Sequence, residues 1–278
     1  LEIAWGAEYT EEMTQSIRWL QDEIADRMLQ KLDIVKLDVQ DILVIPDFLG
    51  NHRAALIKRF PRARIHSVIE DKSLSFQLWI AKACANWRSI FGGIKISSLS
   101  QFHASNKFDI SDNSVDLVFS NLLLHDLTDP KLFLQECWRV LREGGLLVFS
   151  YLGPDTGKEL RFMQGRFLRI KNLSSPWDMH DLGDALVAER FSDPVMDMEF
   201  ITLDYQADAL LLADAQALKL VQPSVTETPQ KGVLPQKMTL EIVYGHAWVI
   251  GKHLTKARDN LAYIQINQIG RKTSSDSP

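Results

Sequence analysis

Two stretches of the sequence decide the fold: Asn-Ser-Val-Asp-Leu-Val-Phe-Ser-Asn-Leu at 113–122 and Trp-Arg-Val-Leu-Arg-Glu-Gly-Gly-Leu-Leu-Val-Phe-Ser at 138–150. Each contains a short apolar run of the kind that forms a buried strand. Between these runs, residues 130–141 are spaced as in an amphipathic helix, and Glu-Gly-Gly at 143–145 is typical of a helix stop and turn. A strand, a helix and a second strand with short connections predict a right-handed unit with parallel strands.

The same alternation continues on both sides of this unit. Toward the N-terminus we predict helices over 11–35, 49–60 and 73–87 and strands over 41–45, 64–69 and 94–98. Toward the C-terminus we predict helices over 156–171, 181–190 and 206–220 and strands over 195–204 and 238–249. Because alternating strands and helices build a parallel sheet between helical layers, the sequence predicts an α/β fold with helices on both faces of a mostly parallel sheet.

Three segments are expected along the chain. Residues 1–40 form an N-terminal helical segment, and residues 41–250 form the α/β domain. Helical insertions are expected in that domain at about 156–190 and 206–237. The polar tail over 251–278 is expected to be partly disordered.

Composition excludes several classes of protein. The 278 residues include 31 Lys and Arg against 36 Asp and Glu, and this net charge of −5 argues against general nucleic-acid binding. Two cysteines, Cys84 and Cys137, exclude a disulfide framework, and no His, Cys and carboxylate cluster has metal-ligand spacing, so no metal is predicted. No apolar run approaches the ~20 residues of a membrane span and no signal-peptide pattern shows, so we expect no membrane association and a cytoplasmic location.

The loop after the first predicted strand is where an open parallel sheet usually holds a nucleotide-like ligand. Such a site needs a glycine-rich turn for close backbone approach and an acid near the end of the second strand for ribose hydroxyls. Here the loop reads Ile-Pro-Asp-Phe-Leu-Gly at 45–50, so only Gly50 remains as a glycine of that turn. Glu70 and Asp71 follow the second strand, and either is a candidate ribose acid or part of a solvated turn.

Several motifs carry a family resemblance. The stretches 113–122 and 138–150 look like the fourth strand, following helix and fifth strand of class I S-adenosylmethionine methyltransferases. More specific motifs follow in order: Gly-Pro-Asp-Thr-Gly-Lys-Glu-Leu-Arg (153–161), Asp-Met-His-Asp-Leu-Gly-Asp-Ala-Leu (178–186), Asp-Pro-Val-Met-Asp-Met-Glu (193–199) and Tyr-Gly-His-Ala-Trp (244–248). Together they resemble the malonyl-acyl-carrier-protein O-methyltransferases of biotin synthesis (BioC), over about residues 20–250.

This resemblance implies a fold, a cofactor and a reaction. The fold is the Rossmann-like class I methyltransferase fold, with a seven-stranded sheet whose final strand is antiparallel, and the cofactor is S-adenosylmethionine. The implied reaction transfers a methyl group to a carboxylate of a substrate carried on an acyl-carrier protein. The implied cofactor-binding residues are Gly50, Glu70, Asp71, Ser120 and Asn121, the last two at the carboxyl end of the fourth strand.

The cofactor motif departs from the family pattern. The family's first motif reads acid-Leu-Gly-x-Gly-x-Gly, whereas Val44, Pro46 and Phe48 stand at the acid and the first two glycine positions. The acid that caps the adenine amino group falls at Ala104. Three lost polar contacts correspond to roughly 3 kcal/mol, or about a hundredfold in affinity.

One face of the predicted helix 156–171 is basic. Lys158, Arg161, Arg166 and Arg169 gather on that face, which is either a solvated charged surface or a docking site for an acidic partner such as an acyl-carrier protein. Arg161 ends a family motif and is therefore the first candidate for substrate or partner contact, with Lys158 and Arg169 beside it.

Two functions stay open at this point. The first is a working methyltransferase of the BioC kind. The second is a catalytically dead pseudo-methyltransferase that acts as a protein-binding scaffold. The loop over 44–50 separates them, because the first function requires an open crevice and the second predicts that Phe48 fills it.

Overall fold

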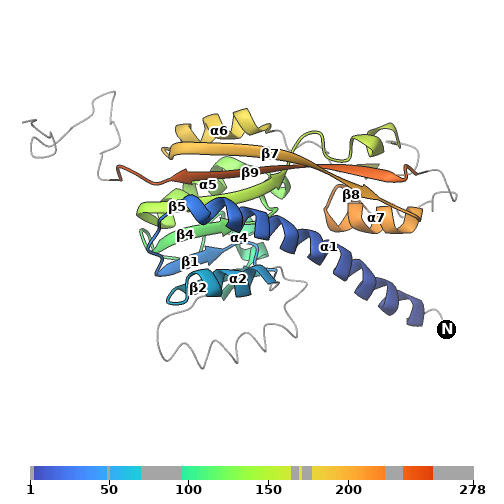
Figure 1. The fold of residues 1–278 in the computed structure, drawn as a ribbon, viewed down its shortest axis with the longest axis horizontal. Coiled ribbons are helices and arrows are strands. Elements are labelled where there is room, and N and C mark those ends of the chain that lie inside the picture. The colour runs from blue at the N-terminus through green and yellow to red at the C-terminus, as the bar shows by residue number, and fades with distance from the viewer. Residues whose placement is uncertain are drawn as a thin grey trace, which may run out of the picture.

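A seven-stranded sheet with the strand order β3-β2-β1-β4-β5-β9-β7 forms the centre of the molecule (Figure 1). The computed structural model describes residues 3–48, 51–69, 96–163, 169–170, 177–222 and 234–252. The strands of this sheet are β1 (Asp41–Val44), β2 (Arg64–Ile69), β3 (Ile96–Ser98), β4 (Val115–Ser120), β5 (Leu141–Leu152), β7 (Ser192–Asp204) and β9 (Lys237–Trp248). Two short strands, β6 (Arg169–Ile170) and β8 (Val221–Gln222), pair separately.

The strand directions are those of the predicted fold. β9 runs antiparallel to β5 and β7, while the pairs β1–β2, β1–β4, β2–β3 and β4–β5 are parallel. The predicted seven-stranded, mostly parallel sheet with an antiparallel final strand is therefore confirmed. The strand order reverses between β1 and β4, which places a ligand crevice beyond the carboxyl ends of these two strands.

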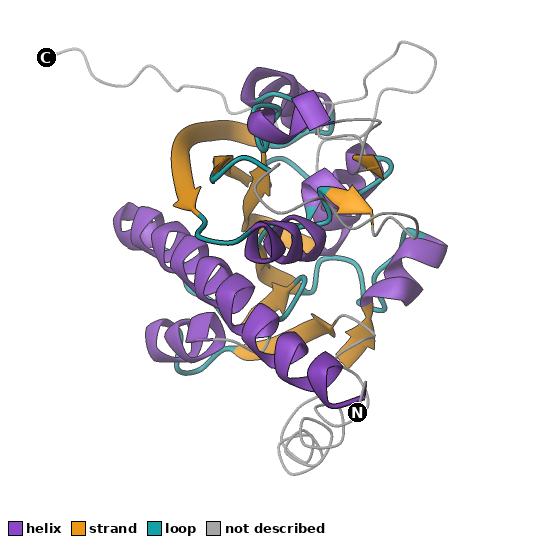
Figure 2. Cartoon of the chain, turned by 90° about the vertical axis from the view of Figure 1, so that its right-hand side faces the viewer, coloured by secondary structure: helices purple, strands orange, loops and turns teal. Residues whose placement is uncertain are grey.

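Helices cover both faces of the sheet. Their bounds are α1 (Ile3–Lys31), α2 (Asn51–Arg59), α4 (Leu99–Ser105), α5 (Pro130–Val140), α6 (Met179–Ala188) and α7 (Asp208–Ala217), with short 3-10 helices at Leu32–Ile34, Leu124–Asp126 and Lys158–Met163. Buried residues of α1, α2 and α7 share one apolar cluster, and those of α4, α5 and α6 share the other. α1 crosses the strands diagonally (Figure 2).

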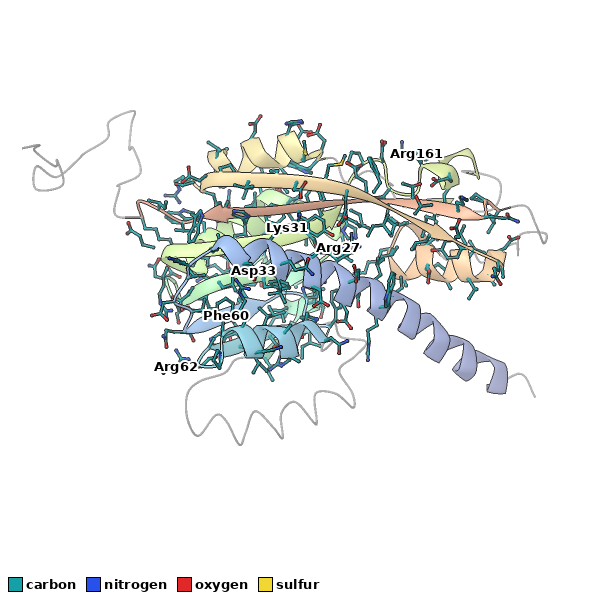
Figure 3. The ribbon with its side chains drawn as sticks, in the orientation of Figure 1. Arg27, Lys31, Asp33, Phe60, Arg62 and Arg161 are labelled. Carbon is teal, nitrogen blue, oxygen red and sulfur yellow. The ribbon has the colours of Figure 1, made fainter. Side chains whose placement is uncertain are left out.

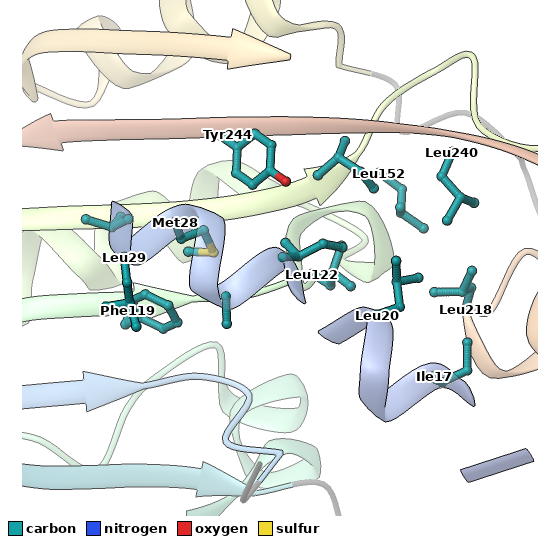
Figure 4. Close-up of a cluster of buried hydrophobic side chains, with 14 of the residues drawn as sticks. Ile17, Leu20, Met28, Leu29, Phe119, Leu122, Leu152, Leu218, Leu240 and Tyr244 are labelled. Atoms are coloured by element: carbon teal, nitrogen blue, oxygen red, sulfur yellow. The ribbon is translucent and has the colours of Figure 1, made fainter. Parts of the chain in front are cut away.

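The two clusters meet at the strands because successive side chains of a strand point to opposite faces. Ile42 and Val44 of β1 belong to the α1 cluster, whereas Leu43 belongs to the α5 cluster. A continuous apolar run is what a parallel strand buried on both faces requires. α1 completes its side with Leu20 and Met28, which are each 1% exposed (Figure 4).

The predicted helix over 156–171 is wrong. The chain forms the short 3-10 helix Lys158–Met163 instead, and residues 169–170 form β6. Contacts with β9 hold this geometry: the Gly157 N–H donates to the Thr239 carbonyl at 2.7 Å, and the Glu159 carboxylate accepts from the Thr239 N–H and hydroxyl at 3.0 and 2.5 Å. Tertiary contacts thus override the local amphipathic pattern.

The glycine pair after α5 also differs from its prediction. β5 begins at Leu141, directly after the helix, so Glu-Gly-Gly at 143–145 lies within the strand rather than before it. The pairing of β4 with β5 shifts between Val115 and Leu117. Gly144 has φ +79°, a conformation that glycine adopts without strain, and it accommodates this irregularity.

Candidate functional site

The crevice predicted from the strand order lies where β1, β4 and the start of α2 meet. Of the predicted cofactor-binding residues, Ser120 and Asn121 lie there, at the end of β4. Gly50, Glu70 and Asp71 lie outside the described residues. The site is therefore built from the loop after β1, the first turn of α2 and the end of β4.

Asp47 lies three residues after the end of β1 and is buried, with only 2% of its surface exposed. The Ser67 hydroxyl donates to its Oδ2 at 2.6 Å, and Arg53 Nη1 donates to the same oxygen at 2.5 Å. The Asp47 N–H donates to the Val68 carbonyl at 2.7 Å, which ties the loop to β2. A buried carboxylate with a cationic partner and a hydroxyl donor is a fixed part of the structure.

His52 fills the space beside Asp47 and is 1% exposed. Its Nε2 lies 3.4 Å from Asp47 Oδ1 and its Nδ1 lies 3.7 Å from Asp22 Oδ1, and neither ring nitrogen forms a hydrogen bond with the described residues. The imidazole lies parallel to the Phe119 ring at 6.4 Å, and Phe48 meets it edge-on at the same distance. Phe48 is only half-buried, whereas Asp47 and His52 are buried. Asp47 and His52 therefore occupy the interior side of the loop.

α1 also contacts this region. Asp22 Oδ1 accepts a hydrogen bond from the Asn51 N–H at 2.9 Å, at the first residue of α2. A free N–H at a helix N-terminus is a ready site for an anionic ligand, and here a side chain of the protein takes it. The Asn121 amide donates to the Gln21 carbonyl at 2.8 Å, so α1 also contacts the end of β4.

The end of β4 is held by a second set of polar contacts. Ser150 donates to Asn121 Oδ1 at 2.8 Å and accepts from the Leu122 N–H at 3.0 Å. Asn121 is therefore engaged on both sides of its amide. Ser120, by contrast, is fully buried, and its hydroxyl has no hydrogen-bond partner in the part of the chain that the structure describes.

The predicted partner-binding residues lie elsewhere. Lys158 and Arg161 belong to one 3-10 helix, in which residues three apart share a side. The Arg161 side chain is 44% exposed, lies 4.0 Å from the Asp155 carboxylate and donates to the Pro154 carbonyl. Arg169 is in β6, and the Lys158 ammonium lies 5.5 Å from the centre of the Phe200 ring.

Two predictions, that no metal is bound and that no segment spans a membrane, concern the whole chain, and the structure bears on them for the described residues. Within the described ranges, no group of three His, Cys, Asp or Glu residues is arranged to hold a metal ion. No helix in those ranges combines the length and apolar character needed to cross a membrane.

Comparison with known proteins identifies the family. Relatives described as malonyl-[acyl-carrier protein] O-methyltransferases include one from Gallionella capsiferriformans, 34% identical over 248 residues, which span 82% of this chain and 83% of the relative. Another, from Coxiella burnetii, is 32% identical over 81% of this chain and 79% of the relative. The chain belongs to this family. The predicted BioC resemblance is thereby confirmed.

Two further comparisons agree with the fold. A family model described as "Methyltransferase domain" matches residues 80–149. The crystal structure of the YcgJ protein from Bacillus subtilis superposes with a TM-score of 0.53 at 10% identity, covering 83% of this chain and 99% of that chain. This likeness supports the Rossmann-like methyltransferase fold.

S-adenosylmethionine is the cofactor of methyltransferases of this kind. The described residues of the crevice do not fit this cofactor. The family cradle needs backbone without side chains, whereas here the loop presents Pro46 and the inward Asp47, whose carboxylate is already paired. The first α2 amide, which a cofactor anion would use, is bonded to Asp22.

Sequence reasoning missed the residues that define this site. It singled out Phe48 as the obstacle in the loop and did not consider Asp47, Arg53, His52 or Asp22. The available signal was an acid directly after a buried strand, where the family pattern leaves a variable position. Its partner Ser67 is twenty residues away on another strand, which a pattern along the chain does not reveal.

Proposed function

We propose that this protein is a catalytically silent member of the malonyl-[acyl-carrier protein] O-methyltransferase family that keeps the fold for recognition of an acyl-carrier protein. The observation that carries this proposal is the buried Asp47 carboxylate, hydrogen-bonded to Arg53 and Ser67 where the family has its glycine cradle. The family membership supports the partner, because the relatives are named for a substrate linked to an acyl-carrier protein.

The energetic argument rests on what a cofactor would displace. S-adenosylmethionine carries a carboxylate, and a second carboxylate beside Asp47 is repelled unless Arg53 changes partner. Moving Arg53 away would leave the buried Asp47 carboxylate without its cation, and because the Arg53 side chain is 30% exposed the cost is below that of a fully buried pair, about 3–5 kcal/mol. A cost of about 1.4–3 kcal/mol corresponds to roughly a tenfold to hundredfold loss of affinity.

The recognition surface proposed for the carrier protein contains Lys158 and Arg161. These cations lie on one short helix, and Arg161 is substantially exposed. An acyl-carrier protein is acidic, so opposite charges steer the encounter and set its orientation. We expect contact at this surface to be weakened by salt, as it is for exposed charges in general.

A second candidate function is methyl transfer with a remodelled crevice. The specific observation that favours it is that three buried polar atoms at the crevice have no hydrogen-bond partner in the described structure: both ring nitrogens of His52 and the Ser120 hydroxyl. Buried polar atoms are normally satisfied, so a bound polar ligand is one explanation for them. A carboxylate substrate is already ionised at neutral pH, so this reaction needs no general base.

Calorimetric titration with S-adenosylmethionine and S-adenosylhomocysteine separates the two candidates. The relative from Gallionella capsiferriformans serves as the positive control. No saturation up to millimolar ligand, with the protein folded by circular dichroism, is the result expected for a silent member. Saturation in the micromolar range would overturn the proposal and favour the remodelled crevice.

Carrier-protein recognition is tested separately with malonylated acyl-carrier protein. We expect Lys158→Glu with Arg161→Glu to weaken binding at least tenfold in biolayer interferometry. Arg62→Glu is the matched control, because Arg62 is also exposed but lies at the opposite end of the molecule from Arg161 (Figure 3). Equal binding by the wild type and the double variant would exclude this surface.

A further inference from the structure

A cavity of about 260 Å³ lies between α1 and the strands β5, β9 and β7. Met28 and Lys31 of α1 line one side, and Val148 of β5, Val195 of β7, and Tyr244 and His246 of β9 line the other. Val148 lies four residues before the carboxyl end of β5. The cavity is therefore on the face of the sheet and distinct from the crevice at the strand ends.

The floor of the cavity is a row of side chains across three strands. His246 pairs with Val148 of β5 on one side and with Val195 of β7 on the other. The next row, two residues along β9, contains Tyr244 opposite Asp197. Met28 of α1 lies across from Tyr244 (Figure 4), so apolar or aromatic side chains contribute to both the floor and the roof.

The charges at the rim are already paired. Lys31 forms an ion pair with Asp197 and lies 4.9 Å from the centre of the Tyr244 ring. One helical turn earlier, Arg27 pairs with Glu199, whose other oxygen accepts from the Tyr244 hydroxyl at 2.6 Å. These two bridges join α1 to β7, and Figure 3 labels their two cations, Arg27 and Lys31, on α1.

On the strand side of the cavity His246 contributes a polar side chain, and Gln30 contributes another from α1. The His246 imidazole is half-buried and forms no hydrogen bond or ion pair with the described residues. Burial lowers the pKa of His246 below its ordinary value of 6.5, so the ring is neutral at pH 7. A neutral imidazole offers one donor and one acceptor nitrogen.

We propose that this cavity binds a small neutral molecule, a single ring or a short branched chain, whose one hydroxyl or amide group hydrogen-bonds His246. An apolar pocket with a few convergent polar groups is the usual form of a small-molecule site. A neutral ligand is favoured because Lys31 and Asp197 beside the cavity are paired with each other, so a charged ligand would have to break this ion pair to find a partner. The site does not depend on the carrier-protein surface or on the cofactor crevice.

The test uses phenol as the probe, with benzene and hexanoate for comparison. Saturation-transfer NMR on the intact protein reports binding, and the His246 ring resonances report the hydrogen bond. We expect saturable phenol binding that shifts the His246 signals, with benzene and hexanoate each at least tenfold weaker. Benzene or hexanoate binding as tightly as phenol would overturn the proposal.

A pair of matched variants locates the site. Val195→Phe narrows the mouth of the cavity, and because Val195 is 52% exposed the change leaves the core intact. Val187→Phe is the control, since Val187 of α6 is 58% exposed and does not line the cavity. We expect Val195→Phe to weaken phenol binding at least tenfold and Val187→Phe to leave it unchanged. No phenol binding by the wild type, or equal weakening in both variants, would exclude this site.

Discussion

Ser67 donates a hydrogen bond from its hydroxyl to the Asp47 carboxylate at 2.6 Å, and this contact joins the loop after β1 to β2. In a nucleotide-binding sheet the loop after the first strand borders the ligand crevice, which lies where the strand order reverses. Here that loop carries a buried carboxylate that is paired with Arg53. The family fold is thus retained, while the side chain of Asp47 in the loop after β1 makes its polar contacts within the protein.

Asp47→Asn is expected to destabilise the protein by about 2–4 kcal/mol, because Arg53 loses its anionic partner and hydrogen bonds to a neutral amide oxygen are weaker than those to a carboxylate. Urea unfolding measures this change. The control is Asp204→Asn, since Asp204 and its partner Lys237 are 75% and 67% exposed, and it should cost less than about 1 kcal/mol. Equal midpoints for the two variants would show that the Asp47 cluster is not a structural element.

The sheet could be predicted from the sequence, but this cluster could not. Short apolar runs such as 115–120 and 146–151 that alternate with helices are typical of buried strands. The sheet therefore follows from the local pattern of the sequence. Asp47, Ser67 and Asp22 come from three separate elements, and only the folded chain brings them together. A buried polar contact of this kind leaves no periodic signal along the sequence.

The helix predicted over 156–171 shows that a clear local pattern in the sequence can also predict the wrong structure. Its apolar and basic positions fit a helical period, yet Glu159 and Gly157 bond to Thr239 of β9, eighty or more residues away. Long-range polar contacts therefore decided the local structure. Lys158 and Arg161 still share one side, because residues three apart are aligned in a 3-10 helix.

Asp41 should contribute to the acid sensitivity of the fold. Burial raises its pKa, but hydrogen bonds from Arg64, Arg142 and His66 outweigh burial and lower the pKa below 3.8. Because the native pKa is lower than the unfolded one, the stabilisation is present above pH 3.8 and is lost as pH falls through the native pKa. The Asp41→Asn variant should therefore have a smaller free energy of unfolding than the wild type at pH 7, and this free energy should fall less on acidification. Urea unfolding at several pH values measures both effects. Parallel curves for variant and wild type would contradict this.

Lys252 is expected to titrate unusually low for a lysine. Burial lowers its pKa to about 8, and its ammonium lies 4.4 Å from the centre of the Trp138 ring and 2.6 Å from Asn113 Oδ1. The unfolded lysine keeps its proton to pH 10.5, so between pH 8 and 10.5 the unfolded state binds more protons and stability rises with pH. NMR of ¹³Cε-labelled lysine should show one signal titrating near pH 8 that Lys252→Gln removes. Titration of every lysine above pH 10 would contradict the prediction.

Gly245 and Gly183 form a matched test of packing at the sheet. A Cβ on Gly245 would lie 2.2 Å from Phe149 Cζ and 2.8 Å from Met196 Sδ, and Phe149 is fully buried, so its ring has no space to move. Gly245→Ala should therefore destabilise the protein by about 1–3 kcal/mol through overpacking. In α6, a Cβ on Gly183 meets its nearest atom at 3.8 Å, and Gly183→Ala should stabilise the helix by up to about 1 kcal/mol. Urea unfolding of both variants checks this, and a Gly245→Ala midpoint at or above that of the wild type would show that β9 can move away from β5.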